Sequence, residues 1–209
     1  IQLKGREVYK IAVPRMAAPD AADQRIFAVL GGGAAGAVAV EALRQEGYRG
    51  RILLITGETF LPYDRTTLSK GYLAEREKQS GVKPLREAAF YQERGIEVLS
   101  GKGVTRVRAE ARQIEFSDGS TLHYDALLLA TGGIPRRLPV PGAELEGVPT
   151  LRAPGDVDRI AAAAQAGSRV VVIGSSFIGM ECAAALRSRK VQVQVVAMEQ
   201  VPFERVLGR

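Results

Sequence analysis

The stretch Ile26-Phe27-Ala28-Val29-Leu30-Gly31-Gly32-Gly33-Ala34-Ala35-Gly36 decides the fold of this chain. It opens with an unbroken apolar run, which is typical of a strand inside a parallel sheet that is buried on both faces. The glycines end this strand, and residues 34–46 have the composition of a helix that Gly47 stops. A second apolar run at residues 51–56 completes a strand–helix–strand unit. We therefore predict an α/β fold built on a Rossmann-like nucleotide-binding domain.

The glycines in this stretch have the spacing of a dinucleotide-binding turn. In such a turn the first glycine permits a sharp bend, the second lets the backbone approach a pyrophosphate, and the third lets helix and strand pack closely. The phosphates then lie at the positive end of the helix dipole. An acidic residue about 20 residues further on is expected to bind ribose hydroxyls, and Glu58 suits that role. The predicted phosphate-binding residues are Gly31, Gly33, Ala34, Ala35 and Gly36.

A second turn of the same kind occurs later in the chain, between an apolar strand at residues 169–173 and a helical segment at residues 177–189. Serine replaces its middle glycine, which adds a hydroxyl toward phosphate but narrows the approach. Glu199 follows the next predicted strand, residues 191–197, and a carboxylate there favours NAD over NADP because it repels a 2′-phosphate. Arg205 lies near enough in sequence to complicate this preference. The residues of the turn are Gly174, Ser175, Ser176, Phe177, Ile178 and Gly179.

Two nucleotide sites in one chain indicate a flavoprotein reductase, in which one bound nucleotide reduces the other. Between them, short alternating segments joined by turns predict a small β-meander at residues 104–108, 113–116 and 121–124. An apolar strand at residues 126–130 and helices at residues 84–94 and 156–166 are also expected. The predicted domains are a linker or upstream-domain tail at 1–24, an FAD-binding domain at 25–140 and a partial NAD-binding domain at 141–209.

Composition narrows the function further. The chain has one cysteine, Cys182, so it lacks the cysteine pair through which a flavoenzyme reduces a disulfide, and a reducing, cytoplasmic setting is favoured. The net charge of +6 fits attraction to anionic dinucleotides or an acidic partner, or a simple solvated surface, since Lys and Arg form no basic block. No motif supports nucleic-acid binding, no apolar run is long enough for a membrane helix, and no metal site is predicted.

Five motifs occur in order at residues 31–36, 61–73, 127–136, 151–156 and 170–186, and read GGGAAG, LPYDRTTLSKGYL, LLLATGGIPR, LRAPGD and VVVIGSSFIGMECAAAL. Together they resemble the FAD-dependent pyridine-nucleotide oxidoreductases, in particular the group of oxygenase-type ferredoxin reductases and apoptosis-inducing-factor-like proteins. The resemblance covers residues 25–209. It implies an FAD domain interrupted by an NAD domain, with the FAD domain and an interface domain following.

Those later parts are missing here, so we expect a longer natural protein, in which any homodimer forms through the missing C-terminal domain. The leading residues IQLKGREVYKIAVP resemble the last strands of a Rieske domain, which implies a [2Fe–2S] cluster in an upstream domain. The chain begins at Ile1, which also suggests a missing N-terminal part.

The resemblance also assigns roles to individual residues. Lys70 would lie near the flavin N5 edge, and Glu181 would pair with it and hold its ammonium in place. Val104 would meet the adenine through its backbone, and Ser175 to Ile178 would line NAD, with Glu199 at its adenosine ribose. The FAD-ribose acid of the family aligns with Gly57 better than with Glu58. The other predicted FAD contacts are Arg65, Thr131, Gly132 and Arg152.

The leading hypothesis is therefore a reductase that passes electrons from NADH through FAD to an iron–sulfur acceptor, either separate or fused upstream. Two alternatives stay open: an NADH oxidase or nitrite-reductase-type flavoenzyme, and an NADH-binding redox-sensing signalling protein. His123 is predicted to be a surface strand residue, and Cys182 a buried small thiol without a redox role.

Overall fold

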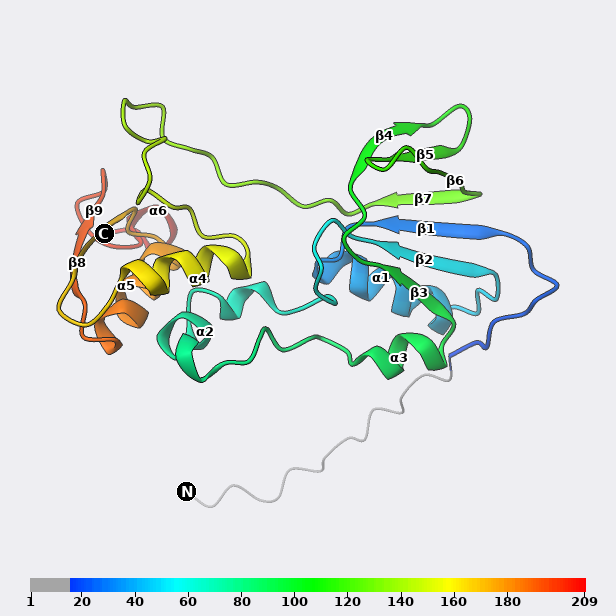
Figure 1. Ribbon diagram of the computed structural model, residues 1–209, viewed down its shortest axis with the longest axis horizontal. Coiled ribbons are helices and arrows are strands. Elements are labelled where there is room, and N and C mark those ends of the chain that lie inside the picture. Colours follow the sequence, from blue (N-terminus) through cyan, green and yellow to red (C-terminus); the bar gives the residue numbers. More distant parts are fainter. Residues whose placement is uncertain (1–15) are drawn as a thin grey trace, which may run out of the picture. The chain divides into compact units, whose positions relative to one another are not determined.

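The computed structural model describes residues 16–209. The segment that resembles the last strands of a Rieske domain falls on residues 1–15 and lies outside the described residues. The chain divides into two compact units. Unit 1 holds the described residues up to Leu61 together with Arg86–Ala130, and unit 2 holds Pro62–Leu85 and Thr131–Arg209. Each unit is an α/β structure, as the sequence predicts (Figure 1).

Unit 1 is built on a parallel sheet in the order β3-β2-β1-β7. The strands are β1 Ile26–Leu30, β2 Arg51–Ile55, β3 Ile96–Leu99 and β7 Ala126–Leu129. β1 and β2 are in register from Ile26 opposite Arg51 to Leu30 opposite Ile55. The predicted strands are confirmed, but β3 is an addition. Its four residues carry a glutamate, so they lack the continuous apolar run that marks β1 and β2.

The two faces of this sheet are covered by different elements. One face packs against α1 (Ala34–Gln45) and α3 (Ala88–Glu93), and the other against the predicted antiparallel meander (Figure 1). The meander strands are β4 Val104–Arg108, β5 Gln113–Phe116 and β6 Thr121–His123. The helix-side core comprises Val29, Val40, Ile52, Leu54, Tyr91 and Ile96. The meander-side core comprises Ala28, Leu53, Ile55, Ile114, Phe116 and Tyr124. Neighbouring residues of β1 and β2 therefore enter opposite cores, which is why their sequences are continuously apolar.

A buried arginine closes the end of α1. Arg44 has no exposed surface, and its guanidinium donates to four backbone carbonyls rather than to a carboxylate. The donor–acceptor distances are 2.8 Å to Arg94, 2.7 Å to Tyr48, 2.9 Å to Gly50 and 2.9 Å to Gly95. Burial lowers the pKa of Arg44. The carbonyls that satisfy the charge belong to the α1–β2 and α3–β3 connections, so this side chain links the segments that follow α1 and α3.

Unit 2 is built on two parallel strands, β8 Arg169–Ile173 and β9 Gln192–Val196, with α4 (Pro154–Ala163) and α5 (Phe177–Ser188). Short helices complete it, namely η1 Arg65–Thr67, α2 Gly71–Ala74, η2 Arg76–Lys78 and α6 Glu204–Leu207. The predicted helices are confirmed with shifted ends. α4 begins at Pro154, which a first helical turn tolerates, and α3 of unit 1 begins only at Ala88, after the bridge between Pro84 and Tyr63.

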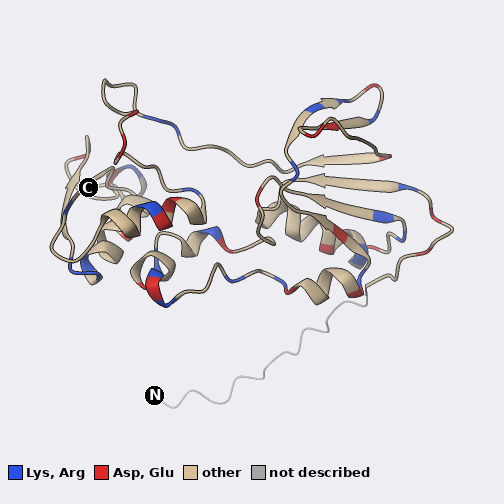
Figure 2. Ribbon diagram, viewed as in Figure 1, with Lys and Arg blue, Asp and Glu red and all other residues tan. Residues whose placement is uncertain are grey.

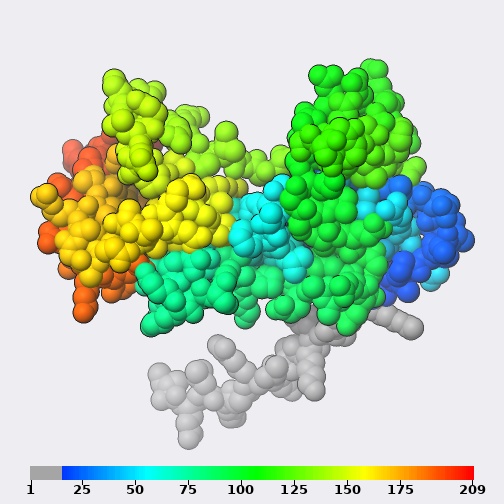
Figure 3. Space-filling model, viewed as in Figure 1, coloured from blue at the N-terminus to red at the C-terminus, as the bar shows by residue number. Residues whose placement is uncertain are grey.

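The segment 62–85 belongs to the core of unit 2, although it lies in the sequence between parts of unit 1. Its buried residues Tyr63, Leu68, Tyr72 and Leu73 pack with residues of α4 and α5, namely Val157, Ala161, Ala185 and Leu186. The space-filling view shows this segment lying directly against α4 at the surface of the unit (Figure 3). The apolar side chains of this segment therefore attach it to unit 2, and with it the loop that contains Ser69 and Lys70.

Lys and Arg as well as Asp and Glu are distributed over the described ribbon of each unit (Figure 2). Many of them are paired at the surface, for example Arg51 with Glu97 and Lys102 with Asp118. No helix among residues 16–209 has the length and apolar character that crossing a membrane requires.

Candidate functional site

The first glycine turn joins β1 to α1 in unit 1 and has the geometry that its spacing predicts. Gly31 has φ 131°, a conformation that favours glycine, and its N–H donates to Ile55 O at 2.8 Å. A Cβ atom on Gly36 would stand 1.9 Å from Gly31 O, so only glycine lets α1 start this close to the strand end. A Cβ atom on Gly33 would meet no protein atom within 4 Å. The space beside Gly33 is thus open, as a pyrophosphate-binding turn requires.

The second turn, between β8 and α5 in unit 2, repeats this geometry. Gly174 has φ 110°, and its N–H donates to Val196 O at 2.8 Å. A Cβ atom on Gly179 would stand 2.1 Å from Gly174 O. Ser176 has φ −90° and ψ −170°, close to the −82° and −174° of Gly33, so the serine fits the same backbone without strain. Each unit therefore carries one such turn.

Both helices that follow these turns begin without a side-chain cap. Gly33 and Ser176 are the N-cap residues of α1 and α5, neither makes a capping side-chain hydrogen bond, and neither helix has an acidic residue in its first turn. The first turn of each helix therefore supplies no carboxylate of its own to the positive end of the helix dipole. Such helix starts are suited to bind phosphate groups. The residues present fit the diphosphate of a dinucleotide at each turn.

Glu58 and Gly57 follow β2 at the same edge of the unit 1 sheet as the first turn. Thr56 is buried, and its hydroxyl accepts from the N–H of Glu58 at 3.2 Å. Glu58 is half-buried, whereas Gly57 is exposed and has no side chain to offer a ribose. Val104 lies at the start of β4, opposite Phe116 in the meander. Gly57, Glu58 and Val104 stay predicted ligand contacts of unit 1.

Glu199 follows β9 in unit 2 and forms an ion pair with Arg205. The distance from Arg205 Nε to Glu199 Oε1 is 2.7 Å, and the carboxylate side chain is only 19% exposed. Phe203 holds the loop between them against the second turn, because its N–H donates to Ser175 O at 3.0 Å and its ring contacts Phe177. Arg205 is therefore in direct contact with the carboxylate whose preference for NAD over NADP it is expected to complicate.

The loop before α2 brings Lys70 to Glu181 of α5, as the resemblance implies. Lys70 Nζ lies 3.3 Å from Glu181 Oε1 and donates to Thr66 O at 3.1 Å. The adjacent residue, Ser69, is buried and donates its hydroxyl to Glu181 Oε2 at 2.5 Å. The Ser69 hydroxyl, and to a lesser extent Lys70, lower the pKa of Glu181 below its usual value, against the opposing effect of burial. The carboxylate is therefore held in its charged form between two neighbours.

Arg65 and Arg152 are also brought together within unit 2. Arg65 Nη1 donates to Arg152 O at 2.6 Å, and the Arg65 guanidinium lies over the Tyr63 ring. The carboxylate of Asp156 accepts from the N–H of Arg152 at 2.7 Å. Gly132 has φ 70°, and a Cβ atom on it would come within 3.1 Å of the Arg152 guanidinium. The exposed Thr131 precedes it in the chain.

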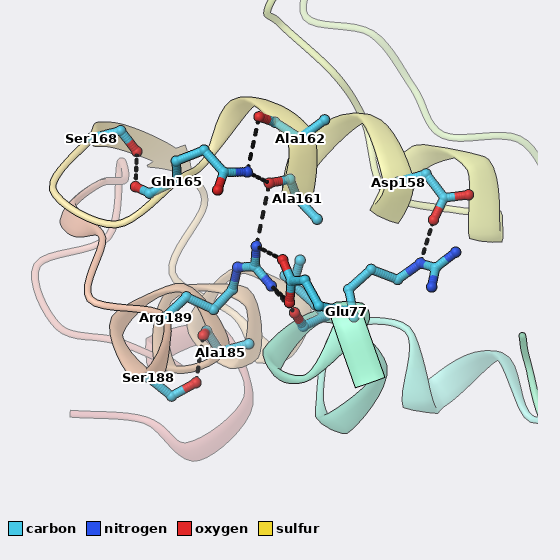
Figure 4. Close-up of polar contacts among 11 residues, drawn as sticks. Glu77, Asp158, Ala161, Ala162, Gln165, Ser168, Ala185, Ser188 and Arg189 are labelled. Atoms are coloured by element: carbon cyan, nitrogen blue, oxygen red, sulfur yellow. Dashed lines mark hydrogen bonds and ion pairs between the residues drawn. The ribbon is translucent and has the colours of Figure 1, made fainter. Parts of the chain in front are cut away.

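A second polar cluster fastens the segment 62–85 to α4 and α5 (Figure 4). Arg189, just after α5, has a side chain only 7% exposed, and both of its terminal nitrogens bind Glu77, at 2.5 and 2.7 Å. The guanidinium also reaches the carbonyls of Leu73 and Ala161, each at 3.3 Å. Arg76 pairs with Asp158 on α4. This polar network, together with the apolar packing of Tyr63, Leu68, Tyr72 and Leu73, keeps the segment that contains Lys70 attached to unit 2.

Sequence reasoning gave no role to Ser69, Asp156 or Arg189. Their partners lie in other elements or are backbone groups, so a linear pattern carries no signal for them beyond the presence of Ser69 inside the LSK motif. Cys182 is partly buried, and burial raises the pKa of its thiol to about 11. His123 is an exposed residue of β6 whose ring lies near the Gln113 side chain.

Comparison with known proteins places these features in one family. The family model described as pyridine nucleotide-disulphide oxidoreductase matches residues 26–209. Apoptosis-inducing factor 3 from Homo sapiens is 43% identical over 180 residues, which are 86% of this chain and 29% of the human protein. The benzene 1,2-dioxygenase system ferredoxin–NAD(+) reductase subunit from Pseudomonas putida is 41% identical over 182 residues, 87% of this chain and 44% of that protein.

A solved structure, the ferredoxin reductase for the CYP199A2 system from Rhodopseudomonas palustris, matches with a TM-score of 0.81 and 35% identity. The match covers 88% of this chain and 45% of that one. The chain thus spans less than half the length of these relatives.

Proposed function

The chain belongs to the pyridine nucleotide-disulphide oxidoreductase family, and on that premise we propose that it is the nucleotide-binding part of an NADH-dependent flavoprotein reductase. The observation that carries the proposal is the duplication of one phosphate-binding turn, with an uncapped helix start each time. One dinucleotide at each turn gives the FAD and NAD(H) pair that the family uses. Two sites also argue against a dehydrogenase with a single nucleotide site.

FAD is assigned to the turn of unit 1 and NADH to the turn of unit 2. The Gly31–Gly36 turn would bind the FAD pyrophosphate through backbone N–H groups, with Glu58 at the ribose and the Val104 backbone at the adenine. The Gly174–Gly179 turn would bind the NADH pyrophosphate, with Glu199 at the adenosine ribose. Bound FAD would supply the capacity to accept a hydride and to release electrons singly. The chain's own residues then bind and orient the two dinucleotides.

Lys70 is assigned the electrostatic role in the reaction. Its ammonium is held by Glu181 and by the Thr66 carbonyl, so it presents a positioned positive charge rather than a freely moving one. Beside the flavin, that charge would stabilise the negative charge that reduction adds. Arg65, Arg152 and the turn at Thr131 and Gly132 are assigned as further contacts of FAD. These assignments rest on the family resemblance of the motifs and stay predictions for this chain.

The electron acceptor is proposed to be an iron–sulfur protein. Relatives are named as ferredoxin reductase components, and a structure named as a covalent complex of putidaredoxin reductase with putidaredoxin matches with a TM-score of 0.78. The absence of a cysteine pair in these 209 residues favours outward electron transfer over reduction of a disulfide. The net charge of +6 would favour encounter with an acidic partner.

The test is the visible spectrum of the full-length protein, before and after anaerobic addition of NADH. We expect a flavin band that NADH bleaches rapidly, and rapid reoxidation when an oxidised [2Fe–2S] ferredoxin is added. A full-length, folded protein that shows no flavin band even with added FAD would refute the proposal. Rapid bleaching without reoxidation by any ferredoxin would retain the first half-reaction and remove the proposed acceptor.

The motifs leave one alternative open, a redox-sensing signalling protein, and one relative is named apoptosis-inducing factor 3. In that role NADH would reduce the flavin slowly, and a long-lived reduced complex would change the oligomeric state. Size-exclusion chromatography of the full-length protein with and without NADH separates the two functions. A change in elution volume together with slow reoxidation would favour the sensor over the reductase.

A further inference from the structure

The Glu181 carboxylate is divided between two neighbouring residues of one loop. Its Oε2 accepts from the Ser69 hydroxyl at 2.5 Å, and its Oε1 faces the Lys70 ammonium at 3.3 Å. Ser69 is 5% exposed, whereas half of the Lys70 side chain is accessible. The buried contact is thus the one made by the serine, and the more accessible contact is the one made by the lysine.

This division gives the serine a directional role. A carboxylate that is bound at one oxygen can still rotate about its last side-chain bond, whereas a carboxylate bound at both oxygens has a fixed plane. The hydrogen bond from the Ser69 hydroxyl to Oε2 fixes the plane of the Glu181 carboxylate. The position of Oε1 is then fixed as well, and it determines where the Lys70 ammonium is held. The contact with Thr66 O at 3.1 Å supplies the second fixed point for the same ammonium.

We propose that Ser69 is a positioning residue, which orients Glu181 so that Lys70 presents its charge at one defined place during flavin reduction. The inference rests on the proposed function, in which Lys70 lies beside the flavin. Ser69 itself does not need to touch the flavin or the nicotinamide. Its effect should therefore fall on the rate of the reduction step and leave the binding of NADH nearly unchanged.

The test uses the full-length protein and compares Ser69→Ala, Ser69→Thr and Thr67→Val. Thr67→Val is the matched control, because the Thr67 hydroxyl lies in the same loop and donates to Asp64 O at 2.7 Å rather than to Glu181. Stopped-flow reduction by NADH gives the limiting reduction rate and the dissociation constant separately. We expect Ser69→Ala to slow the limiting rate about tenfold with less than about a twofold change in NADH affinity, as for the loss of one hydrogen bond to a charged group. Ser69→Thr, which keeps the hydroxyl, should recover most of the rate, and Thr67→Val should reduce like the unchanged protein.

The pH profile of the limiting rate distinguishes positioning from a structural role. The Ser69 hydroxyl lowers the pKa of Glu181, so removing it should raise that pKa, and the rate should begin to fall at a higher pH as the carboxylate becomes protonated. The titratable groups that face this carboxylate are Lys70 from the loop and Cys182 on α5, and the substitution of Ser69 changes neither of them. In a Glu181→Gln background, Ser69→Ala should add no further loss of rate.

Two results would overturn the proposal. The first is a Ser69→Ala protein with a lowered melting temperature but an unchanged limiting rate and an unchanged acid limb. The second is an equal additional loss of rate in the Glu181→Gln background, which would mean that Ser69 acts through another group. Failure of the proposed function would look different, because the unchanged protein would then carry no flavin or show no bleaching by NADH.

Discussion

Two glycines of the first turn make a paired prediction, in which one substitution affects both folding and FAD binding and the other affects mainly FAD binding. In Gly36→Ala the new Cβ would lie 1.9 Å from Gly31 O, whereas a comfortable carbon–oxygen contact is about 3.3 Å. The start of α1 would therefore have to move away from β1 by roughly 1.4 Å, the difference between these contacts. In Gly33→Ala the new Cβ would meet no protein atom within 4 Å, and the φ of −82° suits alanine.

The magnitudes follow from these contacts. Overpacking of a close contact costs about 1–3 kcal/mol, and alanine recovers up to about 1 kcal/mol over glycine inside a helix. Because the nearest atoms are the backbone O and C of Gly31, which cannot rotate away as a side chain can, we expect Gly36→Ala to lower the free energy of unfolding by about 2 kcal/mol and to lower the melting temperature. Gly33→Ala should cost less than about 1 kcal/mol, since it changes only an N-cap preference. Both should weaken FAD binding at least about tenfold, a loss of about 1.4 kcal/mol.

The assay measures melting of the full-length protein after FAD removal, since bound FAD would itself stabilise the fold. FAD affinity is then measured by flavin fluorescence on rebinding. Gly81→Ala is the matched control, because a Cβ there also meets nothing within 4 Å and the residue belongs to no assigned site. A Gly36→Ala protein as stable as the unchanged one would refute the close-packing argument. Full FAD affinity in Gly33→Ala would show that the open space does not hold the phosphates.

Four other predictions follow from the same structure. Lys70→Ala should slow flavin reduction about tenfold or more but change NADH affinity less, and equal losses in a stopped-flow titration would contradict its assigned role. Arg44→Met should lower the free energy of unfolding by about 3–5 kcal/mol in urea, because buried carbonyls lose their donors, while Arg44→Lys should recover part of the loss. Glu199→Gln should narrow the preference for NADH over NADPH in kcat/KM about tenfold, because the repelling carboxylate is gone and Arg205 is released toward a 2′-phosphate. Cys182, with a thiol pKa of about 11, should react with iodoacetamide at pH 8 far more slowly in the folded protein than in urea, as mass spectrometry can follow.

The sequence predicts the parts of the fold whose signals are local. β1, β2, β7 and β8 are short apolar runs next to glycine turns, and each lies where its run predicts. β3 carries no such run, since Glu97 interrupts it and only pairing with β2 makes it a strand. The place of Pro62–Leu85 in unit 2 depends on apolar contacts with α4 and α5, which no local pattern records.

The candidate site divides in the same way. The glycine turns could be predicted with their geometry, because each role of a glycine is set by its immediate neighbours in the chain. The pair of Lys70 and Glu181 came from the family resemblance, and the structure brings the two residues into contact. The contact of Ser69 with the same carboxylate joins positions 112 residues apart, so it could be found only after folding.

The close likeness of the two turns shows where nucleotide selectivity must lie. In each turn the N–H of the first glycine donates to a carbonyl of the neighbouring strand at 2.8 Å. Each following helix starts without a side-chain cap. Turns that offer the same backbone groups cannot by themselves distinguish FAD from NADH, because both ligands carry a pyrophosphate. The difference must come from groups outside the turns, and those after the second strand of each unit lie nearest in the fold pattern. Glu58 in unit 1 and Glu199 in unit 2 occupy equivalent positions after these strands. Glu58 is half-buried, and Glu199 is paired with Arg205. Engineering of cofactor choice in this chain should therefore begin with those carboxylates and leave the glycines unchanged.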